Sequence, residues 1–87
     1  MKAMTKTHRS ILEAVFADPV RANIAWRDIE AMLKAAGAEI TEGKGSRVRI
    51  ALNDIRAVFH RPHRQHEANK GAVRSMRRFL IEAGVLP

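Results

Sequence analysis

Two alternating segments on either side of Asn53-Asp54 constrain the fold of this chain more than any other feature. Large apolar residues alternate with arginine or alanine from Arg47 to Leu52, and a second alternating segment runs from Ile55 to His60. A period of two is typical of a strand with one buried face. Asn53-Asp54 fits the two-residue turn of a hairpin, although Asn-Gly or Asp-Gly is the more usual pair. The sequence therefore predicts an antiparallel hairpin.

A two-residue loop also predicts the register of this hairpin. On one face it pairs apolar residues across the two strands: Leu52 with Ile55, Ile50 with Ala57, and Val48 with Phe59. On the other face it pairs mostly polar residues: Ala51 with Arg56, Arg49 with Val58, and Arg47 with His60. A shift by one residue would turn the arginines into the core, so we expect this register.

The chain before the hairpin predicts two helices. Segment 7–16 has an apolar stripe at helical spacing, with Thr7 as its N-cap and Asp18-Pro19 as its end. Residues 17–25 are expected to connect it to the next helix, with a short extended piece at Ile24-Ala25-Trp26. The second helix is expected over 27–36 and is ended by a glycine, Gly37.

The rest of the chain predicts one further strand and one further helix. Residues 38–41 alternate as a strand, and two glycines mark a loop over 42–45. A basic loop over 61–69 leads to the last helix, over 70–83, which a glycine ends. The order helix, helix, three strands, helix predicts an α+β fold, with the helices packed on one face of a three-stranded antiparallel sheet.

Length and composition narrow the class of protein. A chain of 87 residues allows one domain with one core. No apolar run approaches the roughly 20 residues of a membrane span, and the first residues lack the apolar segment of a secretory signal. Cysteine is absent, which excludes disulfides and zinc–thiolate sites. We therefore expect one domain over residues 1–87, in the cytoplasm and without a membrane partner.

The net charge of +7 lies entirely in the second half of the chain. Residues 1–42 hold six basic and six acidic side chains, whereas residues 43–87 hold ten basic and three acidic ones. Eleven of the sixteen basic residues are arginine, whose planar fork suits phosphate. This distribution favours a polyanionic partner, with nucleic acid first. The simpler interpretation is a solvated basic face without a partner.

Histidines accompany the arginines on this basic half. Attack of a ribose 2′-hydroxyl on the neighbouring phosphate needs a general base, a general acid and cations near the phosphorus. Imidazole suits the proton transfers because it titrates near neutral pH. His60, His63 and His66 are candidates, although an exposed histidine with no catalytic role is the simpler interpretation of each. With Glu67 as the one neighbouring carboxylate they make a poor metal site, so no metal and no cofactor are expected.

Several segments together resemble the HicA-type toxins of type II toxin–antitoxin systems. The stretch from Trp26 to Ala38 resembles their first helix and strand entry, and Gly45-Ser46 resembles their Gly-Ser-His turn. Pro62-His63 resembles their Pro-x-His loop, and NKGAVRSMR at residues 69–77 resembles the helix that follows it. The resemblance covers about residues 24–85.

The resemblance implies a fold, an activity and a partner. It implies a core like a double-stranded-RNA-binding domain over 24–87, with residues 1–23 as an N-terminal helical extension. It implies an mRNA interferase, an endoribonuclease that a HicB antitoxin silences. In the family the usual catalytic histidine follows Gly-Ser, and Arg47 stands there in this chain. His60 is expected opposite Arg47, and His63 matches the family's loop histidine, so these three are the candidate catalytic residues.

Binding to RNA is expected through phosphates. The candidate contacts are one hydroxyl and five basic side chains, those of Ser46, Arg49, Arg56, Arg61, Lys70 and Arg74. An acidic HicB-like antitoxin is expected over the sheet face and the loop 61–70, with carboxylates against Arg47, Arg61 and Arg74.

Other interpretations remain open at this point. The antitoxin could instead bind the neutral half, over 7–37, and act by distortion. The chain could be a non-catalytic RNA-binding module of the same fold. A DNA-binding accessory protein is less favoured, because no recognition helix of a helix-turn-helix is evident.

Overall fold

The computed structural model describes residues 4–62 and 66–87, which form three helices and five strands. The helices are α1 (Lys6–Val15), α2 (Trp26–Ala35) and α3 (Lys70–Ala83). The strands are β1 (Ile24–Ala25), β2 (Glu39–Glu42), β3 (Arg47–Leu52), β4 (Ile55–His60) and β5 (Glu67–Ala68). An antiparallel sheet has the order β2-β3-β4, while β1 and β5 form a small sheet of their own.

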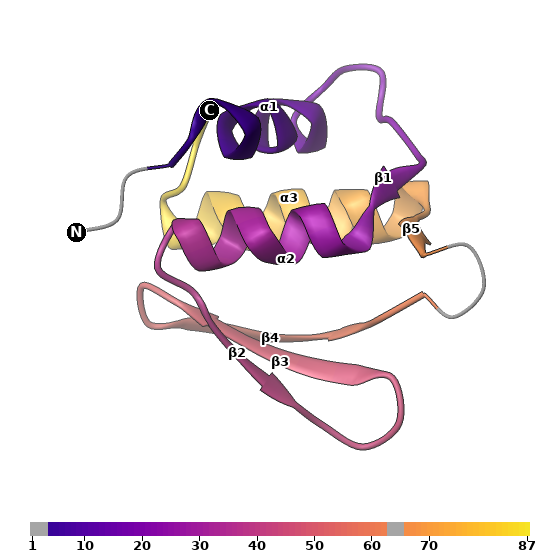
Figure 1. Ribbon diagram of the computed structural model, residues 1–87, viewed down its shortest axis with the longest axis vertical. Helices are drawn as coiled ribbons and strands as arrows, with labels where there is room; N and C mark the ends of the chain where they lie inside the picture. The colour runs from indigo at the N-terminus through magenta and orange to yellow at the C-terminus, as the bar shows by residue number, and fades with distance from the viewer. Residues whose placement is uncertain (1–3, 63–65) are drawn as a thin grey trace.

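The helices lie on one side of the three-stranded sheet, so the predicted α+β fold is confirmed. Helices α2 and α3 cover one face of the sheet, and α1 lies on the far side of these two helices (Figure 1). The other face of the sheet carries exposed side chains of β3 and β4. One face of the sheet is therefore part of the core, and the other face is exposed to solvent.

The predicted hairpin register is confirmed at every pair. Leu52 lies opposite Ile55, and the pairing continues without a break to Arg47 opposite His60. Asn53 and Asp54 have φ of 50° and 68°, the left-handed conformation that a type I′ turn requires at both positions. The Asn53 side chain also donates a hydrogen bond of 2.8 Å to the Ala83 carbonyl, which ties the turn to the end of α3.

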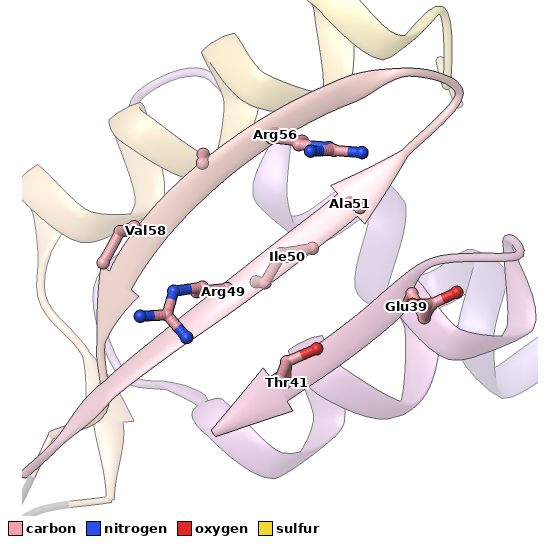
Figure 2. Close-up of a pocket in the computed structure, with 8 residues that line it drawn as sticks. Glu39, Thr41, Arg49, Ile50, Ala51, Arg56 and Val58 are labelled. Atoms are coloured by element: carbon pink, nitrogen blue, oxygen red, sulfur yellow. The ribbon is translucent and has the colours of Figure 1, made fainter. Parts of the chain in front are cut away.

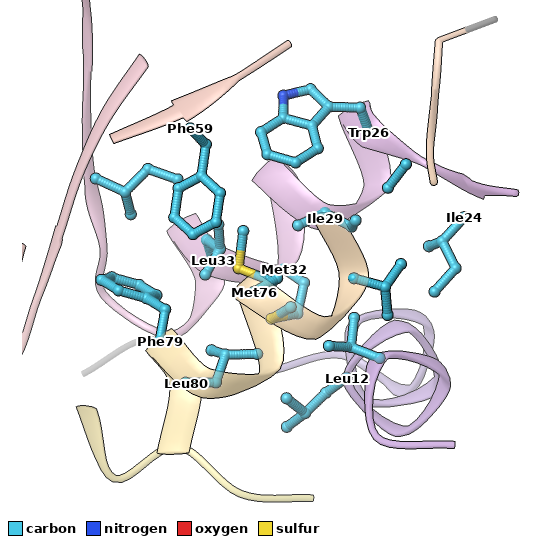
Figure 3. Packing of buried hydrophobic residues seen from close by; sticks show 14 of the residues in the cluster. Leu12, Ile24, Trp26, Ile29, Met32, Leu33, Phe59, Met76, Phe79 and Leu80 are labelled. Carbon is cyan, nitrogen blue, oxygen red and sulfur yellow. The ribbon is translucent and has the colours of Figure 1, made fainter. Parts of the chain in front are cut away.

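One hydrophobic core joins all three helices to the sheet (Figure 3). An aromatic chain runs through it from α2 to α3: Phe59 lies with its ring centroid 6.1 Å from that of Trp26 and 5.7 Å from that of Phe79. Leu12 and Val15 of α1 are buried in the same cluster. The N-terminal helix therefore contributes to the core that positions the sheet.

Several element bounds are shifted by one residue from the sequence-based expectation, and Trp26 is the first residue of α2 and not part of an extended piece. Two further local details also differ. The N-cap of α1 is Thr5 and not Thr7, because Thr5 and His8 form a reciprocal capping box: the Thr5 hydroxyl accepts from the His8 backbone N–H, and His8 Nδ1 accepts from that of Thr5. Glu67 and Ala68, expected within a loop, instead form β5 and pair with β1. Both details depend on partners that a hydrophobic period does not reveal.

Arg77 fastens α1 to α3. Its Nε donates to the Val15 carbonyl at 3.0 Å and its terminal nitrogen donates to the Ala17 carbonyl at 2.7 Å. Its guanidinium also lies 5.9 Å from the centre of the Phe16 ring. Carbonyls at a helix C-terminus have no partner within the helix, so this cation satisfies groups that α1 itself leaves open.

We expect Arg77→Ala to lower the free energy of unfolding by about 1–3 kcal/mol, because two partly buried carbonyls lose their donor. Arg74→Ala is the matched control, since Arg74 is exposed on the same helix, and we expect a change within about 0.5 kcal/mol. Urea unfolding followed by circular dichroism measures both. Equal losses in the two variants would contradict the role assigned to Arg77.

Candidate nucleic-acid interface

The exposed side of the three-stranded sheet is the first candidate surface, and we call it the outer face. Its side chains come from alternate positions of β2, β3 and β4: Glu39, Thr41, Arg47, Arg49, Ala51, Arg56, Val58 and His60. Figure 2 shows several of them around an open hollow of about 410 Å³. Three guanidinium groups and one carboxylate give this surface a net positive charge.

The strand register arranges these side chains in rows. Arg49 lies at the centre, between Thr41 on β2 and Val58 on β4. Val58 is 55% exposed, which is unusual for a valine and leaves an apolar spot beside the central cation. Exposed arginines next to an exposed aliphatic side chain are typical of a face that a nucleic acid or a protein covers.

Arg47 and His60 come together at one end of the outer face. The Arg61 backbone N–H donates to the Ser46 carbonyl at 2.8 Å, so Ser46 and Arg61 form a hydrogen-bonded pair of the antiparallel ladder. The next pair, Arg47 with His60, is therefore of the non-hydrogen-bonded kind, in which Cα atoms are about 4.5 Å apart and side chains are closest. Both side chains are exposed. The two candidate catalytic residues on described strands are thus neighbours.

The loop between β2 and β3 fixes the backbone of Arg47. Its peptide carbonyl accepts from Gly43 N–H at 2.9 Å, and a Cβ built at Gly43 would lie 3.2 Å from the Arg47 Cβ. Gly45 has a φ of +62°, which favours glycine. The close approach to Arg47 favours glycine at position 43, and the positive φ favours it at position 45. Together the two glycines let the loop hold Arg47 at the start of β3.

Arg61, a predicted RNA contact, has an internal role in the structure. Its guanidinium binds both carboxylate oxygens of Glu30 on α2, at 2.7 and 3.0 Å, and one oxygen of Glu42 at 2.6 Å. The Trp26 indole N–H donates to Glu30 as well. This cluster joins the end of β4 to α2 and to the end of β2. Trp26, expected in an extended piece, is the first residue of α2, and nothing in the sequence pointed to Arg61 as the partner of Glu30.

The cluster keeps both of its carboxylates ionised. Hydrogen bonds from Arg61 lower the pKa of Glu30, although partial burial opposes the shift. The same guanidinium lowers the pKa of Glu42, whose side chain is 68% exposed, and the two carboxylates raise the pKa of Arg61. A guanidinium held between two carboxylates is a weaker phosphate ligand than a free one.

Lys70 and Arg74 lie apart from the outer face. Both are exposed on α3, which packs on the opposite side of the sheet. The polar α3 side chains that share a hollow of about 510 Å³ with His60 are Ser75, Arg78 and Glu82, and the apolar ones are Ala72 and Phe79. Neither Ser75 nor Arg78 is among the site residues expected from the sequence, because their position beside β4 depends on how α3 packs.

The two other candidate histidines are His63 and His66. His63 lies outside the described residues. His66 is exposed and lines a third hollow, of about 680 Å³, near Arg61. Among residues 4–62 and 66–87, no three histidine or carboxylate side chains gather as metal ligands would. No helix in that part of the chain is long and apolar enough to cross a membrane.

Comparison with known families gives a match that covers most of the chain. Residues 26–85 match the family described as HicA toxin of bacterial toxin–antitoxin systems. The chain belongs to the HicA toxin family. The matched segment runs from the first residue of α2 to just beyond α3, so it includes the whole three-stranded sheet and excludes α1 and β1. Searches of curated proteins and of solved structures found no match.

The ion cluster makes stability depend on pH in a defined direction. The folded-state pKa of Glu30 lies below its ordinary value of 4.5, so the stabilisation is present above that pH and is lost as pH falls through the folded-state pKa. Arg61→Gln should therefore lower the free energy of unfolding by about 1–3 kcal/mol at pH 7, and by less near pH 3. Urea unfolding at the two pH values measures this.

Arg49→Gln is the control for this prediction, because Arg49 is exposed on the outer face and forms no ion pair within the described chain. We expect it to unfold like the parent at both pH values. A loss for Arg61→Gln that is the same size at pH 3 and pH 7 would contradict the assignment of Glu30 as its main partner.

Proposed function

We propose that this HicA family member is an mRNA interferase, an endoribonuclease that cleaves mRNA with His60 in proton transfer and Arg47 at the phosphate. The observation that supports this most is the pairing of Arg47 with His60 at the end of an exposed sheet face that also carries Arg49 and Arg56. An imidazole beside a guanidinium supplies both a proton carrier and a cation for phosphate chemistry.

The proposed reaction is transesterification within the RNA. A base removes the proton of a ribose 2′-hydroxyl, whose oxygen then forms a bond to the adjacent phosphorus. The bond from phosphorus to the 5′-oxygen breaks, and an acid protonates that oxygen. The products are a 2′,3′-cyclic phosphate and a 5′-hydroxyl. Only protons and electron pairs move, so the step as proposed needs no metal and no cofactor.

His60 is one of the two proton-transfer groups in this proposal, and His63 is the second. In this proposal the guanidinium of Arg47 binds the non-bridging oxygens as negative charge develops on them. Arg49 and Arg56 hold neighbouring phosphates along the outer face, and Ser46 flanks Arg47 at the strand end. Arg61 acts as a positioning residue, because its contacts with Glu30 and Glu42 fix the end of β4 directly after His60.

The partner in the toxin–antitoxin pairing is proposed to be an acidic, HicB-like antitoxin. The positive outer face favours a partner with carboxylates opposite Arg47 and Arg49. Of the three expected contacts, Arg61 already binds two carboxylates and Arg74 lies on α3. We therefore propose that the antitoxin covers the outer face around Arg47 and His60.

His60→Ala should lower the rate of RNA cleavage by about 10²–10⁴-fold, the usual contribution of a general acid or base. The assay follows a labelled RNA and identifies the 2′,3′-cyclic phosphate end of the product. His8→Ala is the matched control, since His8 lies on α1, away from the sheet, and should leave the rate unchanged.

Two outcomes would overturn this assignment. Equal cleavage by the parent, His60→Ala and His63→Ala would remove the histidines from the mechanism. RNA that the parent chain binds but does not cleave would instead identify a non-catalytic RNA-binding module of the same fold.

Binding to RNA should depend on the outer face and on salt. With a 2′-O-methyl RNA, which cannot be cleaved, Arg49→Ala and Arg56→Ala should each weaken binding. Each should also reduce the slope of log K against log salt by about 0.7, the value for one lost contact to a single strand. Arg9→Ala is the matched control, because it removes one positive charge from an exposed position on α1, away from the outer face. Affinity that stays flat between low and moderate salt would refute phosphate binding.

A further inference from the structure

Strand β4 forms an edge of the sheet with backbone groups that β3 does not use. In an antiparallel ladder, hydrogen-bonded and non-hydrogen-bonded pairs alternate. Because Arg61 is hydrogen-bonded to Ser46, the peptide N–H and C=O of Arg56, Val58 and His60 point away from β3. Within the described chain, no other strand pairs with β4, and no further backbone hydrogen bond reaches these three residues. They form a regular row of three donors and three acceptors.

This edge lacks most of the usual protection against another strand. Natural edge strands are kept short, carry charged side chains, or are interrupted by proline or a bulge, and of these β4 has only the exposed charge of Arg56. β4 has six residues, contains no proline, and pairs with β3 through an unbroken register. The other edge of the sheet, β2, has four residues, and the side chain of its last residue, Glu42, is tied to Arg61. β4 is therefore the receptive edge.

A groove accompanies this free edge. Its hollow of about 510 Å³ runs between β4 and α3 and is lined by all six residues of β4. On the α3 side the lining includes the small residues Gly71, Ala72 and Ser75, which leave room beside the strand. Arg78 supplies a cation and Glu82 a carboxylate. Glu82 lies near the hairpin turn, because Asn53 binds the carbonyl of the adjacent Ala83.

We propose that the free edge of β4 binds an extended, acidic segment of the antitoxin as a fourth strand of the sheet. This inference rests on the antitoxin partner proposed above. A polypeptide strand both donates and accepts hydrogen bonds, so it matches the alternating groups of the edge. RNA phosphates only accept, and would leave the carbonyls of Arg56, Val58 and His60 facing negative oxygen. The backbone chemistry therefore favours a peptide.

The polar side chains of the edge define the side chains of its ligand. Arg56 supplies a cation on one side of Val58 and His60 supplies an imidazole N–H donor on the other, so acidic residues are expected at the ligand positions beside them. The intervening ligand residues face the groove along α3, where small apolar side chains fit. A second copy of β4 is a poorer occupant, because antiparallel pairing about Val58 would set each Arg56 opposite a histidine and give it no carboxylate to bind.

Residue-resolved amide hydrogen exchange on the full chain tests this proposal. The probe is a synthetic seven-residue peptide of alternating Glu and Val, with an alternating Lys and Val peptide as the charge control. At saturating Glu/Val peptide we expect the amides of Arg56, Val58 and His60 to exchange at least about tenfold more slowly. The amides of Ala57 and Phe59 already bind β3 and should change little, so protection should alternate along β4.

Each other outcome overturns the proposal. No saturable binding, or protection that does not alternate, removes the added strand. Equal protection by the Lys/Val peptide removes the acidic specificity. Alternating protection by 2′-O-methyl RNA would assign the edge to RNA, and protection that rises with protein concentration alone would assign it to a second copy.

A proline variant tests the same edge in the complex with the antitoxin. Val58→Pro removes an N–H of the free edge and no hydrogen bond to β3, so the hairpin keeps its ladder. We expect it to weaken antitoxin binding at least about tenfold relative to Val58→Thr, with the fold checked by the amide spectrum. Unchanged antitoxin binding would overturn the edge proposal alone. Absence of binding by the parent chain would instead remove the proposed partner, and the peptide experiment would still test the edge.

Discussion

The register of the β3–β4 hairpin decides most of what this molecule can do. A strand has a period of two, so one choice of pairing sends Val48 and Phe59 into the core and turns Arg49 and Val58 to solvent. The same choice sets which peptide groups of β4 bind β3 and which point outward. The core, the basic face and the free edge are therefore consequences of one constraint, and the left-handed backbone of Asn53 and Asp54 fixes it.

The positive charge of the second half divides into cations with internal tasks and cations that face solvent. Arg61 joins α2 to the C-terminal ends of the two edge strands, β2 and β4, through Glu30 and Glu42. Arg77 binds carbonyls at the end of α1. Arg47 and Arg49 remain exposed on the outer face. Net charge thus indicates a polyanionic partner in general terms. The surface that could bind this partner is defined by the arginines that, within the described chain, do not bind a carbonyl or a carboxylate.

The sequence predicted what depends on neighbours in the chain and missed what depends on distant partners. Alternation around Asn53-Asp54 and the apolar stripe of α3 predicted the strands, the register and the helix that the structure has. The contact of Arg61 with Glu30 joins residues 31 positions apart, and β5 has two residues, too few for any period. In the candidate site, the Arg47–His60 pair followed from register, but the nearness of Ser75 and Arg78 required the packing of α3.

His60 lies where two kinds of surface meet, and this position gives the proposed site a physical means of choosing its ligands. Its side chain is on the outer face, where cations attract phosphate and carboxylate alike. Its backbone belongs to the free edge of β4, where N–H and C=O groups alternate and a polypeptide strand, unlike a row of phosphates, satisfies both. Charge on the face therefore draws polyanions of either class, while the edge discriminates between them. A strand bound at the edge would place its own carboxylates beside Arg56 and His60, and so occupy side chains that an RNA phosphate needs.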